Sequence, residues 1–221
     1  MSMLNKTLKD NRIFLVPYLV FLLFAAVILF SAGKKEIHLF INQHHTAFAD
    51  VFFALATYLG DGWFIILPAL ILLIFSLRHF VFLITVYFST GLVTQILKRL
   101  FFEDVVRPSK LLADYNLYIV EGVKMLSGRS FPSGHSTSAF ALFLCLTLIV
   151  KNQTAKFVFF VLALLVAFSR VYLSQHFLID ITVGSIIGST GAIAFYLIFY
   201  RDDRPWHAWS LKRLINQEKN A

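Results

Sequence analysis

The chain has 221 residues, of which 58% are hydrophobic and only 14% are charged. Soluble domains carry about 25% charged residues, so this composition excludes an ordinary soluble domain and indicates an integral membrane protein. The net charge of +8 in so apolar a chain favours anionic lipid over nucleic acid as a partner. The length suits one compact bundle, and the lone Cys145 excludes an intrachain disulfide.

Long apolar runs predict the helices of this bundle. A helix needs about 20 apolar residues to cross a bilayer. The sequence offers six candidate stretches: 13–31, 63–77 with a start a turn or two earlier, 80–97, 131–150, one from 157 past 169, and 181–200. We therefore predict an all-α, six-transmembrane-helix bundle that forms a single domain over residues 1–221. Residues 1–12 would be its N-terminal segment and residues 201–221 its polar tail.

Between the first two predicted spans lies a stretch with helical periodicity. Ile37, Phe40, Ile41, His44 and Phe48 follow an i, i+3, i+4 pattern. This pattern predicts an amphipathic helix that either lies in the membrane interface or packs on the bundle as a cover. We favour the covering helix. His45 has no acid partner one helical turn away, and we interpret it with His44 as a surface residue.

Lysine and arginine in short loops predict the orientation of the chain. Six spans place the N-terminus, the tail and the turns at Arg78 and Lys151 on one side, which we assign to the cytoplasm. The opposite side carries nearly as many cations, which is expected if several of them have a catalytic or binding role. We predict an integral protein of the bacterial inner membrane, with both termini cytoplasmic and an active site that faces the periplasm.

Ionisable residues gather where the predicted spans begin and end on this second side. The third span ends at Lys98 and Arg99, and the following loop contains Arg107. Charged groups beside hydrocarbon are costly and are candidates for function. Each residue alone could equally be an interfacial anchor, but connectivity brings three sequence-distant clusters to one face. The clusters are Lys98 to Arg107, Pro132 to His135, and Ser169 to Asp180.

The residue types in these clusters suit phosphoryl chemistry. His176 and Asp180 are four residues apart and share a face if that stretch is helical, so the carboxylate can orient the imidazole as a nucleophile or base. His135 is suited to donate and recover a proton. The cations Lys98, Arg107 and Arg170 can neutralise a phosphate.

An anion could also bind where the fourth span begins. Ser133 and the Gly134 amide lie at a predicted helix N-terminus, where amide groups and the helix dipole favour an anion. No cluster of carboxylates offers a Mg²⁺ or Ca²⁺ site. Two histidines with one aspartate could hold a transition metal, but the surrounding cations would repel it. We therefore expect no metal and no other cofactor. Asp61, in the sequence LGDGW, lies on the same face and could steer a headgroup or polarise a lysine, but we favour its interpretation as part of a solvated turn.

Three motifs in this region resemble those of the type 2 phosphatidic acid phosphatase (PAP2) family. Ser169-Arg170, five residues, His176, three residues and Asp180 match the family's last motif, and Pro132-Ser133-Gly134-His135 match its middle motif. Arg107-Pro108 resembles the end of the first motif. That motif normally has six residues between Lys and Arg-Pro, whereas eight follow Lys98 and seven follow Arg99. Lys98 and Arg99 are therefore rivals for the first basic position.

The resemblance implies a six-helix membrane hydrolase that removes phosphate from lipids without a metal. By position, His176 would attack phosphorus and form a phosphohistidine, Asp180 would orient it, and His135 would protonate the leaving oxygen. The phosphoryl oxygens would be held by Lys98, Arg107, Ser133, Gly134 and Arg170.

The sequence leaves the substrate and the oligomeric state open. Undecaprenyl diphosphate, lipid A phosphate, phosphatidylglycerol phosphate and phosphatidic acid are the candidate lipids, and we rank the first two highest. Two other functions stay open. A proton-coupled transporter would use the histidines and the aspartate as a relay, although no internal repeat supports it. An inactive lipid-binding relative should have lost a histidine or the aspartate, and the chain retains all three.

Overall fold

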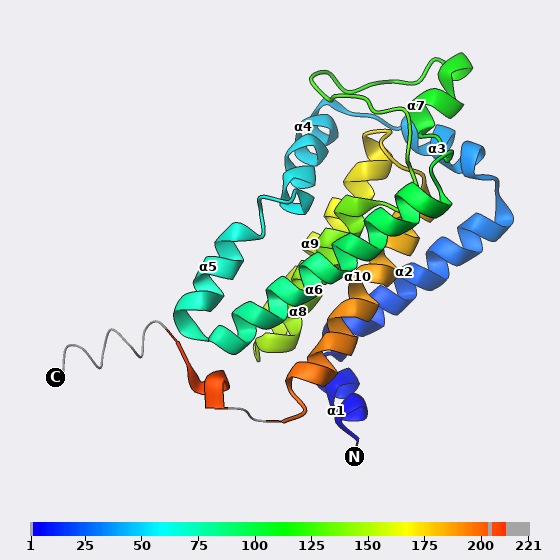
Figure 1. The fold of residues 1–221 in the computed structure, drawn as a ribbon. Helices are drawn as coiled ribbons and strands as arrows, with labels where there is room; N and C mark the ends of the chain where they lie inside the picture. Colours follow the sequence, from blue (N-terminus) through cyan, green and yellow to red (C-terminus); the bar gives the residue numbers. More distant parts are fainter. Residues whose placement is uncertain (1, 203–204, 211–221) are drawn as a thin grey trace.

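A computed structural model describes residues 2–202 and 205–210, and the regular secondary structure of these residues is entirely helical (Figure 1). Four of the described helices are long and apolar enough to cross a membrane: α2 (Arg12–Ser31), α6 with its π-helical end (Leu77–Phe101), α9 (Gln153–Tyr172) and α10 (Leu178–Phe199). The remaining α-helices are α1 (Met3–Asp10), α3 (Lys34–Asn42), α4 (Ala47–Ala56), α5 (Ile66–Phe75), α7 (Pro108–Leu111) and α8 (Gly134–Ile149).

Helix α8 is the centre of the bundle. It packs against α6, α9 and α10, and its buried side chains point in all directions, among them Phe140, Leu142, Leu144 and Cys145. Burial of its side chains on every side, and not hydrophobicity alone, shows that other helices surround α8. Because neighbouring helices hold α8 on several sides, the position of its first turn, which contains His135, is fixed.

Two glycines bring α10 unusually close to α8. A Cβ at Gly184 would lie 2.5 Å from the carbonyl oxygen of Ser133, and a Cβ at Gly188 would collide with that of Thr137. Small residues four apart permit close approach of helix backbones in membranes. This approach allows the Ser133 amide to donate a hydrogen bond to the Asp180 carbonyl at 3.0 Å, which joins two of the sequence motifs directly.

The second predicted span is interrupted. We expected one helix over residues 63–77, but the structure has α4, a 3₁₀ turn at Thr57–Gly60, a break, and then α5 (Figure 1). Asp61 has an extended ψ of 150° and is flanked by two glycines, which disfavour a continuous helix. The apolar segment therefore begins at residue 47 and bends at residues 57–65.

Helix α3 is the amphipathic helix predicted between the first two spans, but it ends at Asn42, so His44 and Phe48 lie outside it. It attaches to the loop of residues 98–132: the Asn42 side chain donates to the Tyr118 carbonyl and accepts from the Tyr118 amide, both at 2.9 Å. His38 of α3 lies 3.0 Å from the Ser174 hydroxyl, and burial lowers the pKa of His38 to about 4.

The interpretation of His45 as a surface residue is wrong. Its Nδ1 lies 2.7 Å from Asp50 Oδ1, and its ring packs on Tyr118 and Tyr172, whose hydroxyls also donate to Asp50. The acid partner is five residues away because a helix break separates them.

The opposite end of the bundle holds α1 and the described part of the tail (Figure 1). There the buried Lys156 amine donates to the Asp10 carbonyl at 2.8 Å and to Asn11 Oδ1 at 2.7 Å. The predicted single domain and the terminal segment at residues 1–12 stay predictions, and much of the predicted tail at 201–221 lies outside the described residues.

Candidate active site

Four segments meet at one end of the bundle. They are the π-helical end of α6, the start of α7, the start of α8 and the turn of residues 173–177 between α9 and α10. The loop of residues 98–132 covers this end together with α3 (Figure 1). The clusters that connectivity predicted on one face thus lie together in space.

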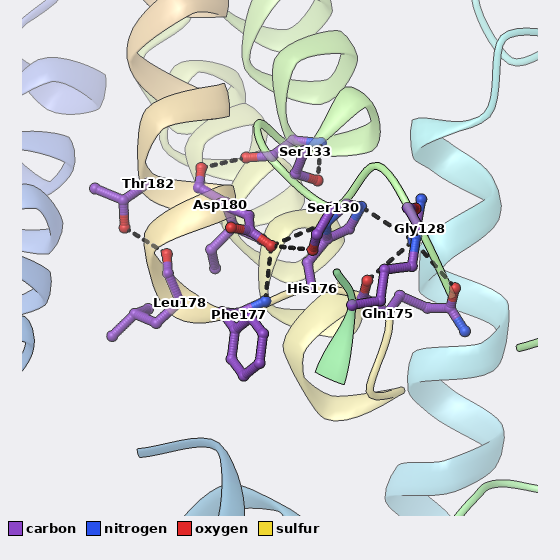
Figure 2. A network of polar contacts seen from close by, with 12 residues as sticks. Gly128, Ser130, Ser133, Gln175, His176, Phe177, Leu178, Asp180 and Thr182 are labelled. Atoms are coloured by element: carbon purple, nitrogen blue, oxygen red, sulfur yellow. Dashed lines mark hydrogen bonds and ion pairs between the residues drawn. The ribbon is translucent and has the colours of Figure 1, made fainter. Parts of the chain in front are cut away.

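Asp180 is the centre of a buried polar network (Figure 2). Its Oδ2 accepts a hydrogen bond from the Ser130 hydroxyl and one at 3.0 Å from the Phe177 amide. His176 Nδ1 lies 3.3 Å from the same oxygen, and His176 and Asp180 are each only 1% exposed. A carboxylate so bound fixes the orientation of the imidazole and leaves Nε2 as its open nitrogen.

The turn before α10 is folded back on the end of α9. The amides of Gln175 and His176 both donate to the Arg170 carbonyl, at 2.9 and 3.0 Å, and Ser174 adopts a left-handed φ of 53°. A main-chain hydrogen bond therefore joins Arg170 and His176, two residues of the last motif.

Arg107 lies beside the open nitrogen of His176. One guanidinium nitrogen, NH1, is 3.4 Å from His176 Nε2 and donates to the Gln175 carbonyl at 2.9 Å, while Nε donates to the Gly128 carbonyl at 3.0 Å. Arg107 is 7% exposed. The carbonyl groups hold the guanidinium at the position where a phosphoryl group attached to Nε2 would need positive charge.

The surroundings keep His176 neutral. Burial lowers the pKa of His176 well below its usual value of 6.5, and the positive charges of Arg107, Arg170 and Lys98 lower it further. A neutral imidazole has the free electron pair that nucleophilic attack requires. At neutral pH the site therefore holds this ring in its nucleophilic form.

The two rivals for the first basic position differ in their environment. Lys98 is 8% exposed and interacts electrostatically with Arg107, Asp180 and Arg170. Arg99 is exposed. Arg129, the cation next to Ser130 in sequence, forms an exposed 2.8 Å ion pair with Glu103.

Ser133 caps α8 and is completely buried. Its hydroxyl accepts a 3.4 Å hydrogen bond from the Ser136 amide, and its own amide is used by Asp180, as described above. Gly134 is the first residue of α8, so its amide lies at the helix N-terminus. The predicted anion-binding role of these two residues stays a prediction.

His135 lies at the same helix N-terminus but has a partner of its own. Its Nε2 is 2.8 Å from Asp61 Oδ1. It interacts electrostatically with Arg170, His176, Arg107 and Lys98. Asp61 does lie in a bend with its side chain 37% exposed, but its carboxylate also contacts a candidate catalytic side chain, which the interpretation as a solvated turn did not include.

Arg170 reaches the site from the last turn of α9. Its NH1 donates to the Thr57 hydroxyl at 2.6 Å, and its buried Nε has no hydrogen-bond partner among the described residues. An unpaired buried N–H is costly and is available to an anion.

A cavity of about 730 Å³ opens between α4 and the loop of residues 98–132. His135, Arg170, Gln175 and Asp61 line it at one end, and Asp50, Tyr118, Glu121 and Lys124 lie elsewhere in its wall. Val51, Leu55 and Tyr58 of α4 also line it and are 62%, 63% and 62% exposed. The cavity is therefore polar at the motif residues and apolar along the outer side of α4.

Sequence reasoning missed several residues of this network: Thr57, Gly128, Ser130 and Gln175. Ser130 and Gln175 immediately flank the recognised motifs, and that adjacency was the available signal. Thr57 is far from the motifs in sequence, and no local pattern singles it out. Among the described residues, no group of three His, Cys, Asp or Glu side chains is arranged to hold a metal ion.

Comparison with known proteins decides the family. A family model described as the PAP2 superfamily matches residues 79–204, more than half of the chain. The chain belongs to the PAP2 superfamily. The matched region contains the three motifs and the buried network of Asp180.

Solved PAP2 structures have the same fold. The crystal structure of Aquifex aeolicus LpxE aligns with a TM-score of 0.65 and 29% identity, and covers 72% of this chain and 92% of LpxE. The first transmembrane PAP2-type phosphatidylglycerolphosphate phosphatase from Bacillus subtilis aligns with a TM-score of 0.63 and 21% identity, covering 90% of this chain and 99% of the other. The predicted all-α membrane bundle of the PAP2 type is thereby confirmed.

One curated relative matches part of the sequence. A lipid A 4'-phosphatase from Bacteroides thetaiotaomicron is 31% identical over 94 residues. The match spans 42% of this chain and 41% of that protein. Together with the apolar helices, these relatives identify this PAP2 chain as an integral membrane protein.

Proposed function

We propose that this protein is a membrane lipid phosphatase that hydrolyses a terminal phosphate or diphosphate through a phosphohistidine intermediate. The observation that carries the proposal is the arrangement at His176: Asp180 at its Nδ1 and the Arg107 guanidinium 3.4 Å from its Nε2. A nucleophile, its orienting acid and an anion-stabilising cation are thus in contact at one buried position.

The proposed reaction has two steps. In the first, His176 Nε2 attacks phosphorus, the bond from phosphorus to the leaving oxygen breaks, and His135 donates a proton to that oxygen. In the second, His135 removes a proton from water, the resulting nucleophile attacks phosphorus, and the P–N bond breaks to release phosphate. Arg107, Arg170 and Lys98 would balance the charge on the phosphoryl oxygens, with Ser133 and the Gly134 amide at the helix N-terminus.

The distribution of buried charge supports a phosphatase rather than a proton-coupled carrier. Of the buried charged side chains in the described part of the chain, only Lys156 lies away from the site end, and it is bonded to Asp10 and Asn11. A relay would need ionisable groups through the membrane depth. Retention of His135, His176 and Asp180 supports activity over lipid binding alone.

The cavity and the relatives support a choice of substrate class. The cavity is polar at the motif residues and has an apolar, exposed wall on α4, which suits a phosphorylated headgroup attached to acyl or prenyl chains. The matched relatives include a lipid A 4'-phosphatase and a phosphatidylglycerolphosphate phosphatase. We propose lipid A phosphate and undecaprenyl diphosphate first, ahead of phosphatidylglycerol phosphate and phosphatidic acid. The cavity would face the periplasm, with both termini in the cytoplasm.

The test is phosphate release from these four lipids by the purified full-length protein, in detergent and with EDTA present. We expect turnover without added metal, and we expect His176→Ala and His135→Ala to lower it by at least about 1,000-fold. A phosphorylated protein trapped by acid quench should be seen in the wild type and be absent in His176→Ala. Wild-type rates in His176→Ala would refute the nucleophile, and loss of activity with EDTA would refute the metal-free mechanism.

A further inference from the structure

A short segment outside the matched family region contacts two candidate site residues. Residues 57–61 form the 3₁₀ turn after α4 and the start of the break before α5. Thr57 accepts a hydrogen bond from Arg170, and Asp61 contacts His135. The family model begins at residue 79, so Thr57 and Asp61 both lie outside the matched region.

Gly60 allows this segment to approach the site. A Cβ at Gly60 would lie 2.5 Å from Cγ1 of Val166 on α9 and 3.3 Å from Cβ of His135 on α8. Val166 is completely buried and its short branched side chain has little freedom to move. The missing side chain of Gly60 therefore sets how closely Asp61 can approach the imidazole.

The charges around His135 explain why an acid would be needed there. The other charged or titratable groups that act on it are Arg170 of α9, His176 of the 173–177 turn, Arg107 at the start of α7 and Lys98 at the end of α6. All of these are cationic or become so on protonation, and positive neighbours oppose a protonated imidazole. Asp61 is the carboxylate in direct contact with this ring, and Tyr87 of α6 interacts with that carboxylate.

We propose that Asp61 is a positioning residue for His135: its carboxylate accepts the Nε2–H hydrogen bond, fixes the ring and stabilises the imidazolium among the surrounding cations. The inference rests on the proposed function, in which His135 is the general acid. With Nε2–H held by Asp61, Nδ1 is the nitrogen that gives the proton to the leaving oxygen and recovers one from water. The Nε2 proton stays in place throughout, so the step balances without another group.

The alternative role for Asp61 is direct contact with the substrate headgroup, because Asp61 also lines the cavity. The two roles differ in their kinetic effect. Loss of a headgroup contact raises KM and changes lipid preference. Loss of the imidazolium partner lowers kcat/KM most at high pH, where the acid must still hold its proton.

The experiment measures kcat and KM between pH 5 and pH 10 on the full-length protein in detergent, with the two lipids that the wild type hydrolyses fastest among the four candidates as substrates. For Asp61→Asn, which keeps the shape but removes the charge, we expect the alkaline limb of kcat/KM to move down by about one pH unit or more. KM should change little. Asp61→Glu should restore part of the shift, and Gly60→Ala should resemble Asp61→Asn because it displaces the segment.

Asp114→Asn is the matched control, since Asp114 is an exposed acid at the same end of the molecule, and it should keep the wild-type profile. An unchanged alkaline limb in a folded Asp61→Asn, or a change confined to KM, would overturn the inference while the wild type remains active. A wild type that releases no phosphate from any of the four lipids would instead overturn the proposed function. Thermal midpoints in detergent verify that each variant is folded.

Discussion

Lys98 and Arg99 are neighbours in the chain, but their side chains lie in different surroundings. The π-helical turn at Leu97–Phe101 places Lys98 in the buried site and Arg99 in an exposed position. A buried cation beside a candidate phosphate site can act on the substrate far more strongly than a solvated one. The environment favours Lys98 for the first basic position, despite its irregular spacing from Arg107.

A pair of variants tests this choice. We expect Lys98→Ala to lower kcat/KM for phosphate release by about 100-fold, a typical effect of removing one group that stabilises transition-state charge. Arg99→Ala should remain close to the wild type, because water already solvates that guanidinium. Initial rates at pH 7 on the lipid that the wild type hydrolyses fastest provide the measurement. A larger loss in Arg99→Ala would reverse the assignment.

For single residues, the sequence predicted contacts between residues that are close together in the chain. His176 and Asp180 are four residues apart, and this spacing predicts their contact, which the structure has, although His176 lies in the turn before the first residue of α10, Leu178. Asp61 and His135 are 74 residues apart, and their contact depends on how the interrupted span packs against α8. No local pattern encodes such a contact, so the sequence placed Asp61 on the same face but did not identify His135 as its partner, and it gave no signal for Thr57.

The contact between α8 and α10 is the element that holds the motifs together. Gly184 of α10 faces the Ser133 carbonyl, and the neighbouring Ser133 amide bonds to the Asp180 carbonyl. A larger residue at Gly184 must separate these two helix ends. The position of His135 relative to His176 depends on this separation, since each is attached to one of the two helices.

Gly184→Ala should therefore harm both stability and activity. We expect a loss of about 1–3 kcal/mol in stability, as is typical of overpacking, together with a fall in kcat. Gly91→Ala on α6 is the matched control, because a Cβ there would meet nothing within 4 Å, and it should be neutral or slightly stabilising. Thermal midpoints in detergent and phosphate release give the two readouts. Equal midpoints for the two variants would contradict this account of the packing.

Apolar periodicity predicted the uninterrupted helices well. The expected spans at 80–97, from 157 past 169, and at 181–200 correspond to α6, α9 and α10 within a few residues. The second span was misplaced because α4 has an aspartate at position 50 and the break contains Gly60 and Asp61, which read as a polar loop. In the fold, Asp50 accepts a hydrogen bond from Tyr172 and Asp61 contacts His135. A hydropathy pattern contains no information on these tertiary contacts.

For the whole molecule, the expected orientation in the membrane follows from the Lys and Arg residues at the two ends of the bundle. The candidate site and the loop of residues 98–132 lie at one end, and α1 and the start of α9 at the other (Figure 1). The site end should face the periplasm according to the distribution of Lys and Arg in the loops. A lipid headgroup in the outer leaflet of the inner membrane would then lie at the depth of the cavity.

Single cysteines in a Cys145→Ala background test this orientation. We expect an impermeant thiol reagent to label Asp114→Cys in spheroplasts, whereas Gln153→Cys should react only after lysis. Both positions are exposed and lie at opposite ends of the bundle, so accessibility alone does not separate them. The reverse pattern would place the site in the cytoplasm, and labelling of both from outside would contradict the arrangement of the spans.

The open side of the cavity along α4 has a kinetic consequence. Val51, Leu55 and Tyr58 are exposed there, so a lipid substrate can present its headgroup while its chains remain among other lipids. The substrate concentration that sets the rate is then its mole fraction in the surrounding micelle or bilayer, and not its molarity in the buffer. Diluting the substrate with inert detergent at constant total substrate should slow turnover, whereas diluting the whole suspension with water should leave the rate per enzyme molecule nearly unchanged.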